Sequence, residues 1–223
     1  MKHYAIIVGG GSGSRMQSEL PKQFMLLAEK PILMHSIEAF YHSEYKPDII
    51  VVLNVDFHLY WENLCEKYHF SVPHTLVKGG NHRFDSVKNG LKLIKGKAII
   101  AIHDAVRPLI SKQLINYSYR EAELSGNAVA AIKSRDSVRL KNDQLSSSLN
   151  RDEIFLVQTP QTFSSDILNK AYKQDFRNEF TDDASVVERL GISINLIEGE
   201  NTNFKITFPE DLKIAEFYLS SRN

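Results

Sequence analysis

The sequence predicts an α/β protein: a mostly parallel β-sheet flanked by helices, in a single domain over residues 1–223. Two observations carry this prediction. Short runs of consecutive apolar residues alternate with longer segments in which apolar residues recur every three or four positions, the spacing of an amphipathic helix. Several of these runs end in glycine or polar residues, which is typical of strands buried on both faces. Strands that alternate with helices are joined by right-handed crossovers and lie parallel.

The strands are expected in the apolar runs. The first is Tyr4–Val8, which leads into glycines, and the others cover residues 48–53, 75–77, 98–102, 128–132 and 192–198. Helices are expected at residues 31–41, 56–68, 85–94, 111–124 and 209–219. The last of these begins with Pro209, which suits the first helical position, and continues with two acidic residues that favour the positive end of the helix dipole.

Residues from about 135 to 155 interrupt the alternation. They contain two short strand-like stretches around a polar turn at residues 141–144, with little apolar content. An isolated hairpin cannot build its own core, so we expect an inserted β-arm that packs on another subunit.

Composition excludes several classes of function. Lys and Arg number 27, as do Asp and Glu, so the formal net charge is zero and the basic surplus of a nucleic-acid-binding protein is absent. An anionic ligand must therefore be held by local cations. The single cysteine, Cys65, excludes an intrachain disulfide and reads as a small buried apolar residue. No apolar run approaches the length of a membrane span or a signal sequence, so a cytoplasmic location is expected.

The first candidate site follows the first strand. It combines glycines, which let backbone N–H groups approach phosphate oxygens, with two cations. Its members are Gly9, Gly10, Gly11, Ser12, Gly13, Arg15 and Lys22. The segment lacks the Gly-Lys-Ser/Thr ending of a P-loop and the Gly-x-Gly-x-x-Gly spacing of a dinucleotide-binding turn. The pattern therefore favours binding of a nucleotide by a different phosphate loop.

A second candidate site follows the strand at residues 98–102. Ligands of parallel sheets bind at the carboxyl ends of strands, and the polar segment His103–Pro108 lies there. Asp104 is a candidate for Mg²⁺ coordination or for accepting hydrogen bonds from ribose and substrate hydroxyls. Arg107 is a candidate phosphate or hydroxyl ligand. The alternative is an internal Asp104–Arg107 ion pair, and His103 is expected to be a packed structural residue.

These motifs resemble a known family. Gly11-x-Gly13-x-Arg15-Met16 followed by Pro21-Lys22-Gln23-Phe24 is similar to the opening signature of the 2-C-methyl-D-erythritol 4-phosphate cytidylyltransferases of the non-mevalonate isoprenoid pathway, and of the related ribitol-5-phosphate cytidylyltransferases. The resemblance continues through Gly79-Gly80-x-x-Arg83-x-x-Ser86-Val87, Ile102-His103-Asp104-Ala105-Val106-Arg107-Pro108, Gln158-Thr159-Pro160-Gln161-x-Phe163, Thr181-Asp182-Asp183-Ala184-Ser185 and Lys205-Ile206-Thr207-x-Pro209-Glu210-Asp211-Leu212.

The resemblance implies a Rossmann-like nucleotidyltransferase fold of the GT-A type, with a β-arm at about residues 135–155 for homodimerisation. It implies transfer of CMP from CTP to methylerythritol phosphate, with release of pyrophosphate and with Mg²⁺ as cofactor. Neither a nucleic acid nor a membrane is an expected partner. The alternatives are a ribitol-5-phosphate cytidylyltransferase, a sugar-1-phosphate nucleotidylyltransferase that uses another base, and a catalytically silent nucleotide-binding protein of the same fold.

The resemblance also implies roles for individual residues. The catalytic cations are Arg15, Lys22 and Lys205. The nucleotide is held by Gly9, Gly10, Gly11, Ser12, Gly13, Gly80, Asn81, Ser86, Asp104 and Ala105, where the family often has Asp in place of Asn81. The polyol phosphate is held by Asp104, Arg107, Ser137, Thr159, Thr181 and, from the neighbouring subunit, Arg151, where the family usually has Thr in place of Ser137. Asp104 is the candidate metal ligand.

Three acidic residues near Thr181 suggest two readings. Asp182, Asp183 and Glu188 resemble a metal cluster, but we interpret them as charges at a helix N-terminus that is capped by Thr181. Arg83 is either part of the nucleotide site or a structural ion-pair partner.

Overall fold

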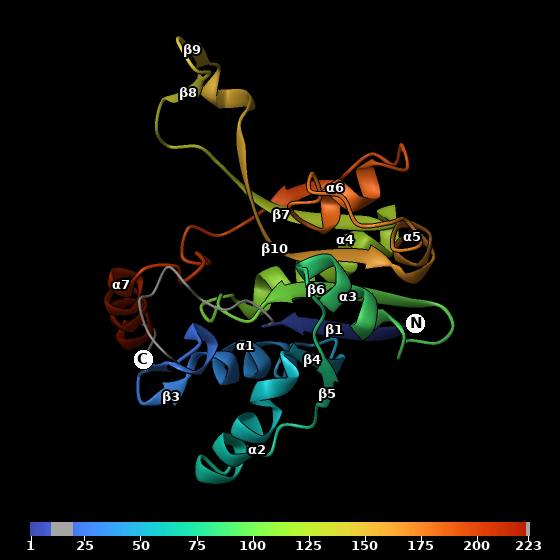
Figure 1. The fold of residues 1–223 in the computed structure, drawn as a ribbon, viewed down its shortest axis with the longest axis vertical. Helices are drawn as coiled ribbons and strands as arrows, with labels where there is room; N and C mark the ends of the chain where they lie inside the picture. The colour runs from blue at the N-terminus through green and yellow to red at the C-terminus, as the bar shows by residue number, and fades with distance from the viewer. Residues whose placement is uncertain (10–19, 222–223) are drawn as a thin grey trace.

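The computed structural model describes residues 1–9 and 20–221. In these residues a seven-stranded mixed sheet has the strand order β11–β7–β10–β6–β1–β4–β5, and β10 alone runs antiparallel to its neighbours (Figure 1). The strands are β1 (Lys2–Val8), β4 (Asp48–Leu53), β5 (Thr75–Lys78), β6 (Ala98–Asp104), β7 (Asn127–Lys133), β10 (Phe155–Ser164) and β11 (Leu196–Glu198).

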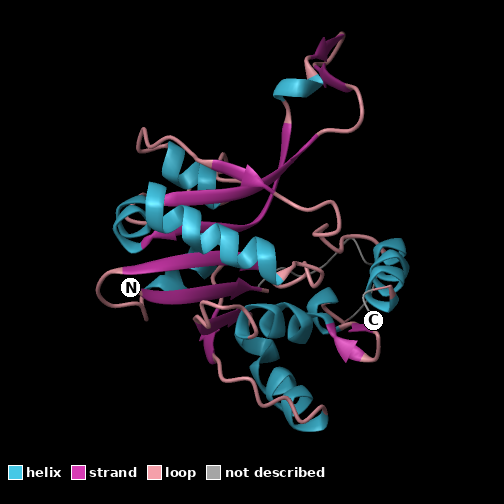
Figure 2. Ribbon diagram, turned by 180° about the vertical axis from the view of Figure 1, so that it is seen from behind, coloured by secondary structure: helices cyan, strands magenta, loops and turns pink. Residues whose placement is uncertain are grey.

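Helices cover both faces of the sheet (Figures 1 and 2). They are α1 (Ile32–Tyr41), α2 (His58–Lys67), α3 (Arg83–Leu91), α4 (Lys112–Ser125), α5 (Ser165–Ala171), α6 (Asp183–Glu188) and α7 (Pro209–Ser220). Side chains of a strand alternate between faces, so Ile7 packs in the core with α1, α2 and α4, and Ile6 packs in the core with α3, α5 and α6. Both faces need apolar residues, and this explains the continuous apolar runs of the sequence. No helix in the described part of the chain combines the length and apolarity that a bilayer crossing requires.

Strand β10 is the main feature that the apolar pattern did not predict. It lies between β6 and β7 although half of it is polar and it contains Pro160. Its register against β7 shifts between Val157 and Gln161, so the proline falls where the ladder is interrupted and its missing N–H is tolerated. The expected strand at residues 192–198 is also shorter, because only Leu196–Glu198 pair with β7.

The β-arm is confirmed as a hairpin. Strands β8 (Val138–Lys141) and β9 (Ser146–Leu149) pair with each other, and a 3₁₀ turn η4 (Arg151–Glu153) leads back to the sheet. The arm is inserted between β7 and β10, whose residues Lys133 and Phe155 pair with each other. Figure 1 shows it projecting far beyond the rest of the molecule.

Short elements complete the described fold. They are the 3₁₀ helices η2 (Lys22–Phe24) and η3 (Val55–Phe57) and the two-residue strands β2 (Leu26–Leu27) and β3 (Lys30–Pro31). Leu27 of β2 and Ala215 of α7 pack with Val106 and Ile206 in a small separate core. This core fixes the chain around residue 206 beside the segment that follows β6.

Candidate active site

The site lies where the strand order changes direction. In the sheet, β4 and β5 lie on one side of β1, and β6 lies on the other side. The carboxyl ends of β1 and β6 therefore border a topological switch point. Beyond the strands the pairing continues: the Gly9 N–H donates to the Val52 carbonyl at 2.9 Å and the Ala105 N–H to the Val8 carbonyl at 3.0 Å. A Cβ on Gly9 would lie 2.7 Å from Leu53 Cδ2 and 3.2 Å from the Ala105 Cβ, so a side chain there would have to displace Leu53.

Lys22 is held in this region by residues far away in the sequence. Its side chain is 9% exposed, and its Nζ donates to the Ile206 carbonyl at 2.9 Å. The next residue, Gln23, donates from Nε2 to the Gly9 carbonyl at 2.7 Å. Element η2 is therefore fastened both to the end of β1 and to the segment that contains Lys205.

Lys205 approaches the same place from the carboxyl-terminal part of the chain. The Ile206 N–H donates to the Val106 carbonyl at 2.9 Å, which aligns residue 205 with the end of β6. Lys205 Nζ lies 3.1 Å from Asp104 Oδ2. The structure thus brings Lys22 and Lys205 to one end of the sheet. Arg15, Gly10, Gly11, Ser12 and Gly13 lie outside the described residues.

Asp104 forms the centre of a cluster of cations. Its Oδ2 lies 3.1 Å from Lys205 Nζ and 3.3 Å from Arg107 Nε, and its Oδ1 lies 3.5 Å from Arg83 Nε. Burial by itself would raise the pKa of Asp104, but Lys205, Arg83 and Arg107 outweigh burial and hold that pKa well below its usual range. The carboxylate is therefore ionised, and the ion pair with Arg107 that the sequence left as an alternative is present.

The surroundings of Asp104 do not resemble a metal cage. Mg²⁺ in proteins is held by carboxylates together with water and phosphate oxygens. Here the carboxylate faces three cations, and within residues 1–9 and 20–221 no group of three or more His, Cys, Asp or Glu side chains is arranged to hold a metal. A contact of Asp104 with Mg²⁺ stays a prediction.

A pocket of about 320 Å³ opens beside this cluster. Its lining includes Arg83, Asp104, Arg107, Thr159, Thr181 and Lys205. Strand β10 brings Thr159 to the pocket, where its hydroxyl accepts a hydrogen bond from the Asp104 N–H at 3.0 Å. The structure therefore joins four of the six predicted polyol-phosphate residues with a predicted catalytic lysine. The other two, Ser137 and Arg151, are exposed in the arm, outside strands β8 and β9, and do not line the pocket.

His103 is a structural residue, as the sequence predicted. It is fully buried, and burial lowers its pKa to about 4. Because the Arg107 carbonyl can only accept, His103 Nε2 donates to it at 3.2 Å, and Nδ1 is left to accept from the Thr159 hydroxyl at 3.0 Å. The neutral ring thus orients Thr159 towards Asp104.

The predicted cytosine-reading segment follows β5. The Gly80 N–H donates to Ser86 Oγ at 3.0 Å, and the same hydroxyl donates to the His82 carbonyl at 3.1 Å. A Cβ on Gly80 would lie 2.2 Å from the Asp85 Cβ, so this turn requires glycine. Ser86 is 2% exposed and holds the turn, while Asn81 is exposed at its tip. Direct contact of these residues with the base stays a prediction.

The expectation that Thr181 caps α6 is wrong. The cap is Asp182, whose carboxylate accepts from the Ser185 N–H at 2.9 Å in a capping box. Asp183 is also more than a charge near the helix dipole. It is fully buried, 2.7 Å from Arg83 Nη2, and accepts a hydrogen bond from the Tyr172 hydroxyl. The sequence signal for the burial of Asp183 was its place at the start of an apolar helix, directly before Ala184.

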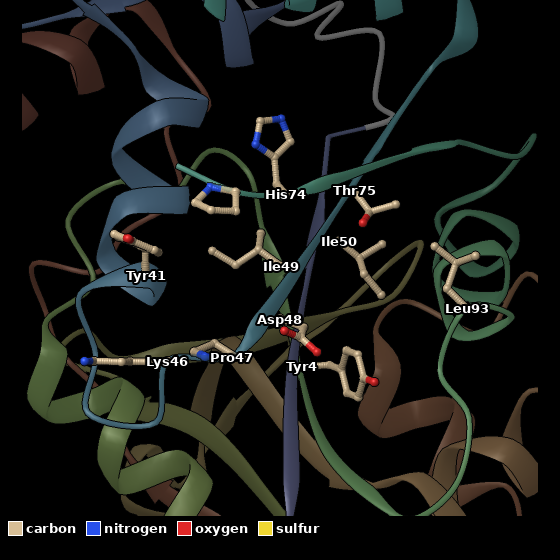
Figure 3. Close-up of a pocket in the computed structure, with 11 residues that line it drawn as sticks. Tyr4, Tyr41, Lys46, Pro47, Asp48, Ile49, Ile50, His74, Thr75 and Leu93 are labelled. Atoms are coloured by element: carbon tan, nitrogen blue, oxygen red, sulfur yellow. The ribbon is translucent and has the colours of Figure 1, made fainter. Parts of the chain in front are cut away.

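A larger hollow of about 450 Å³ lies elsewhere, between the starts of β4 and β5 (Figure 3). Asp48, Ile49 and Thr75 line it, and all three are at the amino ends of their strands. Lys46 is the single Lys or Arg in its lining. One cation is insufficient for a triphosphate, so this hollow is not a candidate for the active site.

Comparison with known proteins identifies the family. The model of the family IspD, 2-C-methyl-D-erythritol 4-phosphate cytidylyltransferase, matches residues 3–221. The 2-C-methyl-D-erythritol 4-phosphate cytidylyltransferase of Phocaeicola vulgatus is 44% identical over 97% of this chain and 99% of its own length. That of Azobacteroides pseudotrichonymphae is 47% identical over 96% of each chain.

Solved structures give the same result. A 4-diphosphocytidyl-2C-methyl-D-erythritol synthase from Anaerococcus prevotii aligns with a TM-score of 0.84 at 25% identity, over 98% of this chain and 96% of that one. The 2-C-methyl-D-erythritol 4-phosphate cytidylyltransferase of Thermus thermophilus aligns with a TM-score of 0.77 at 26% identity. The predicted fold class is confirmed, and the chain belongs to the 2-C-methyl-D-erythritol 4-phosphate cytidylyltransferase family.

Proposed function

We propose that this chain transfers CMP from CTP to 2-C-methyl-D-erythritol 4-phosphate and releases pyrophosphate. Family membership supports the reaction, and one structural observation supports its location: Lys22, Lys205, Asp104 and Arg107 gather at the switch point beside a 320 Å³ pocket. A pocket of that size suits a small polyol phosphate.

The reaction needs attack by a phosphate monoester oxygen on the α-phosphorus of CTP. That oxygen is anionic near neutral pH, so no general base is required. His103 is buried and neutral and its ring nitrogens are already bonded, which agrees with this requirement. The barrier comes from repulsion between anions and from charge that develops at phosphorus, and preorganised cations lower it.

Each cation has a proposed task. Arg15, Lys22 and Lys205 neutralise the triphosphate and stabilise the in-line transition state. Arg107 holds the incoming phosphate. Asp104 accepts hydrogen bonds from substrate hydroxyls, and Thr159 and Thr181 line the polyol side of the pocket.

Three further features belong to the same proposal. Mg²⁺ would accompany CTP, bound to its phosphates, and would supply additional charge neutralisation. The β-arm would form a homodimer, in which Arg151 of each subunit, with Ser137 near it, enters the neighbouring site. The enzyme would act in the cytoplasm. The exposure of Arg151 in a single chain supports the shared site, because the residue does not reach its own pocket.

A pyrophosphate-release assay tests the reaction. Methylerythritol phosphate and ribitol phosphate are each combined with CTP, ATP, GTP and UTP in the presence of Mg²⁺. We expect release with methylerythritol phosphate and CTP to exceed every other combination by at least about a hundredfold in kcat/KM. A preference for ribitol phosphate would assign the rival polyol. Calorimetric binding of CTP without any turnover would instead indicate a silent nucleotide-binding protein.

A further inference from the structure

Arg83, at the start of α3, connects two carboxylates that belong to different parts of the molecule. Its Nη2 lies 2.7 Å from Asp183 Oδ2, and its Nε lies 3.5 Å from Asp104 Oδ1. Asp104 lines the substrate pocket, whereas Asp183, the first residue of α6, is fully buried and is not part of the lining. One guanidinium therefore joins the pocket to a helix behind it.

The contact with Asp183 fixes Arg83 in place. Asp183 is fully buried, and a buried carboxylate is strongly destabilising unless it is paired with a charge and hydrogen-bonded. Arg83 supplies the charge and the Tyr172 hydroxyl supplies a second hydrogen bond. Burial opposes charge on Arg83, but Asp183 and Asp104 outweigh burial and raise its pKa further, so the guanidinium stays charged.

Aromatic contacts hold the same two segments together. The rings of His82 and Phe176 stack at 3.8 Å with an interplanar angle of 7°. The rings of Phe84 and Tyr172 stack at 4.8 Å with an angle of 22°. The start of α3 is thus packed against the segment that leads to α6, and Arg83 has little freedom to move.

The two oxygens of Asp104 consequently have different surroundings. Oδ2 faces Arg107 and Lys205, the cations to which we assign the anionic substrates, and Oδ1 faces Arg83. Phosphates bound here would compete with Asp104 for Arg107 and Lys205. Arg83 is paired with the buried Asp183, so its contact with Oδ1 would not be subject to this competition.

We propose that Arg83 is a positioning residue that anchors Asp104 to the buried Asp183 and so fixes the carboxylate orientation that receives the polyol of the phosphate acceptor. The inference rests on the proposed function, because it assigns Asp104 to the polyol hydroxyls. It predicts an effect on the acceptor and little effect on CTP.

The test is a double variant with a matched control. Arg83→Gln/Asp183→Asn removes both charges together and leaves amide groups of similar size, so no buried carboxylate is left unpaired. Tyr172→Phe removes the other hydrogen bond to Asp183 and does not touch Asp104. We expect the double variant to raise KM for methylerythritol phosphate about tenfold, with KM for CTP changed less than about twofold. Tyr172→Phe is expected to lower the melting temperature and leave both KM values within about twofold.

Each outcome is decisive. A double variant that loses thermal stability as Tyr172→Phe does, but keeps its KM for methylerythritol phosphate, overturns the positioning role. If circular dichroism shows that the double variant does not fold, Arg83→Lys decides: lysine can pair with Asp183 but lacks the fork that reaches Asp104, so the same rise in KM is expected. An unchanged KM in Arg83→Lys would contradict the proposal. Wild-type protein without turnover would overturn the proposed function itself, and this inference with it.

Discussion

Lys22 illustrates at the scale of one residue how the site depends on the fold. Its ammonium group is nearly buried and is held on the carbonyl of Ile206, next to Lys205. A cation fixed in this way stabilises developing charge without the cost of reorganisation. Lys22→Ala is expected to lower kcat for pyrophosphate release by at least about a hundredfold.

The control for this variant is Lys112→Ala, because Lys112 is exposed at the start of α4 and lies outside the pocket. Both variants should give the far-ultraviolet circular dichroism of the wild type. A kcat for Lys22→Ala close to that of Lys112→Ala would remove Lys22 from the mechanism.

His103 is expected to make stability depend on pH. In the unfolded chain a histidine takes up a proton near pH 6.5, whereas burial lowers the pKa of folded His103 to about 4. Between these values the unfolded state binds more protons, so the free energy of unfolding falls as pH decreases. From pH 7 to 4.5 the loss attributable to His103 is about 2 to 3 kcal/mol.

Urea unfolding of wild type and His103→Gln at several pH values checks this prediction. His35, whose pKa burial also lowers, is present in both proteins, so the difference between them isolates His103. Parallel curves of stability against pH would show that His103 is not the group responsible.

The sequence was informative about single residues where a motif places them at the end of a strand. Asp104 was predicted in this way, whereas Lys205 was predicted only through the family resemblance, and the two side chains lie 3.1 Å apart. The partnership of Arg83 with Asp183 was not predictable, because 100 positions separate the two residues and each alone resembles a surface charge near a helix start. The pair is apparent only from the packing of α3 against the segment that leads to α6.

Whole elements were predictable where apolar residues are consecutive, and β10 shows why others were not. The strands β1, β4 and β6 are apolar on both faces, so their sequences identify them. In β10 the buried residues include Gln158, Thr159 and Gln161, which are polar because they face the site. Gln161, for example, donates to Asp182 Oδ2 at 2.9 Å and accepts from the Ala184 N–H. Polar side chains that line the pocket and hold the start of α6 thus obscured the apolar pattern of the strand.

The β-arm gives a prediction at the scale of an element. Its Leu140 is 61% exposed in the single chain, and Leu124 of α4 is 76% exposed. If the arm packs on a second subunit, Leu140 becomes buried there and Leu124 does not. Leu140→Ser should therefore weaken the dimer by about tenfold or more in dissociation constant, and Leu124→Ser should leave it unchanged. Sedimentation equilibrium measures both, and equal effects would contradict a dimer formed through the arm.

The whole molecule has zero formal charge, yet it gathers cations at one end of its sheet, beyond the carboxyl end of β6. In the proposed dimer each site would take Arg151 from the other subunit. This sharing can be tested by mixing Lys22→Ala and Arg151→Ala subunits after reversible dissociation. A mixed dimer would contain one site with both mutations and one with neither.

Random mixing in equal amounts should restore about a quarter of the wild-type specific activity, because half of the dimers are mixed and each has one intact site. The two variants assayed separately provide the baseline. Activity that stays at this baseline, in a mixture shown by native mass spectrometry to contain mixed dimers, would place Arg151 in the site of its own chain.

The pairing of Lys133 with Phe155 has a consequence for how such proteins diversify. Strands β7 and β10 already pair with each other at the base of the arm, as the two strands of a hairpin do. The arm is therefore an enlarged hairpin loop, and its removal or exchange would leave the pairing of β7 with β10 intact. Selection can therefore alter the length and surface of this loop in one lineage without disturbing the sheet. Because the same loop carries Arg151, a change of partner surface and the chemistry at the neighbouring phosphate would remain linked in evolution.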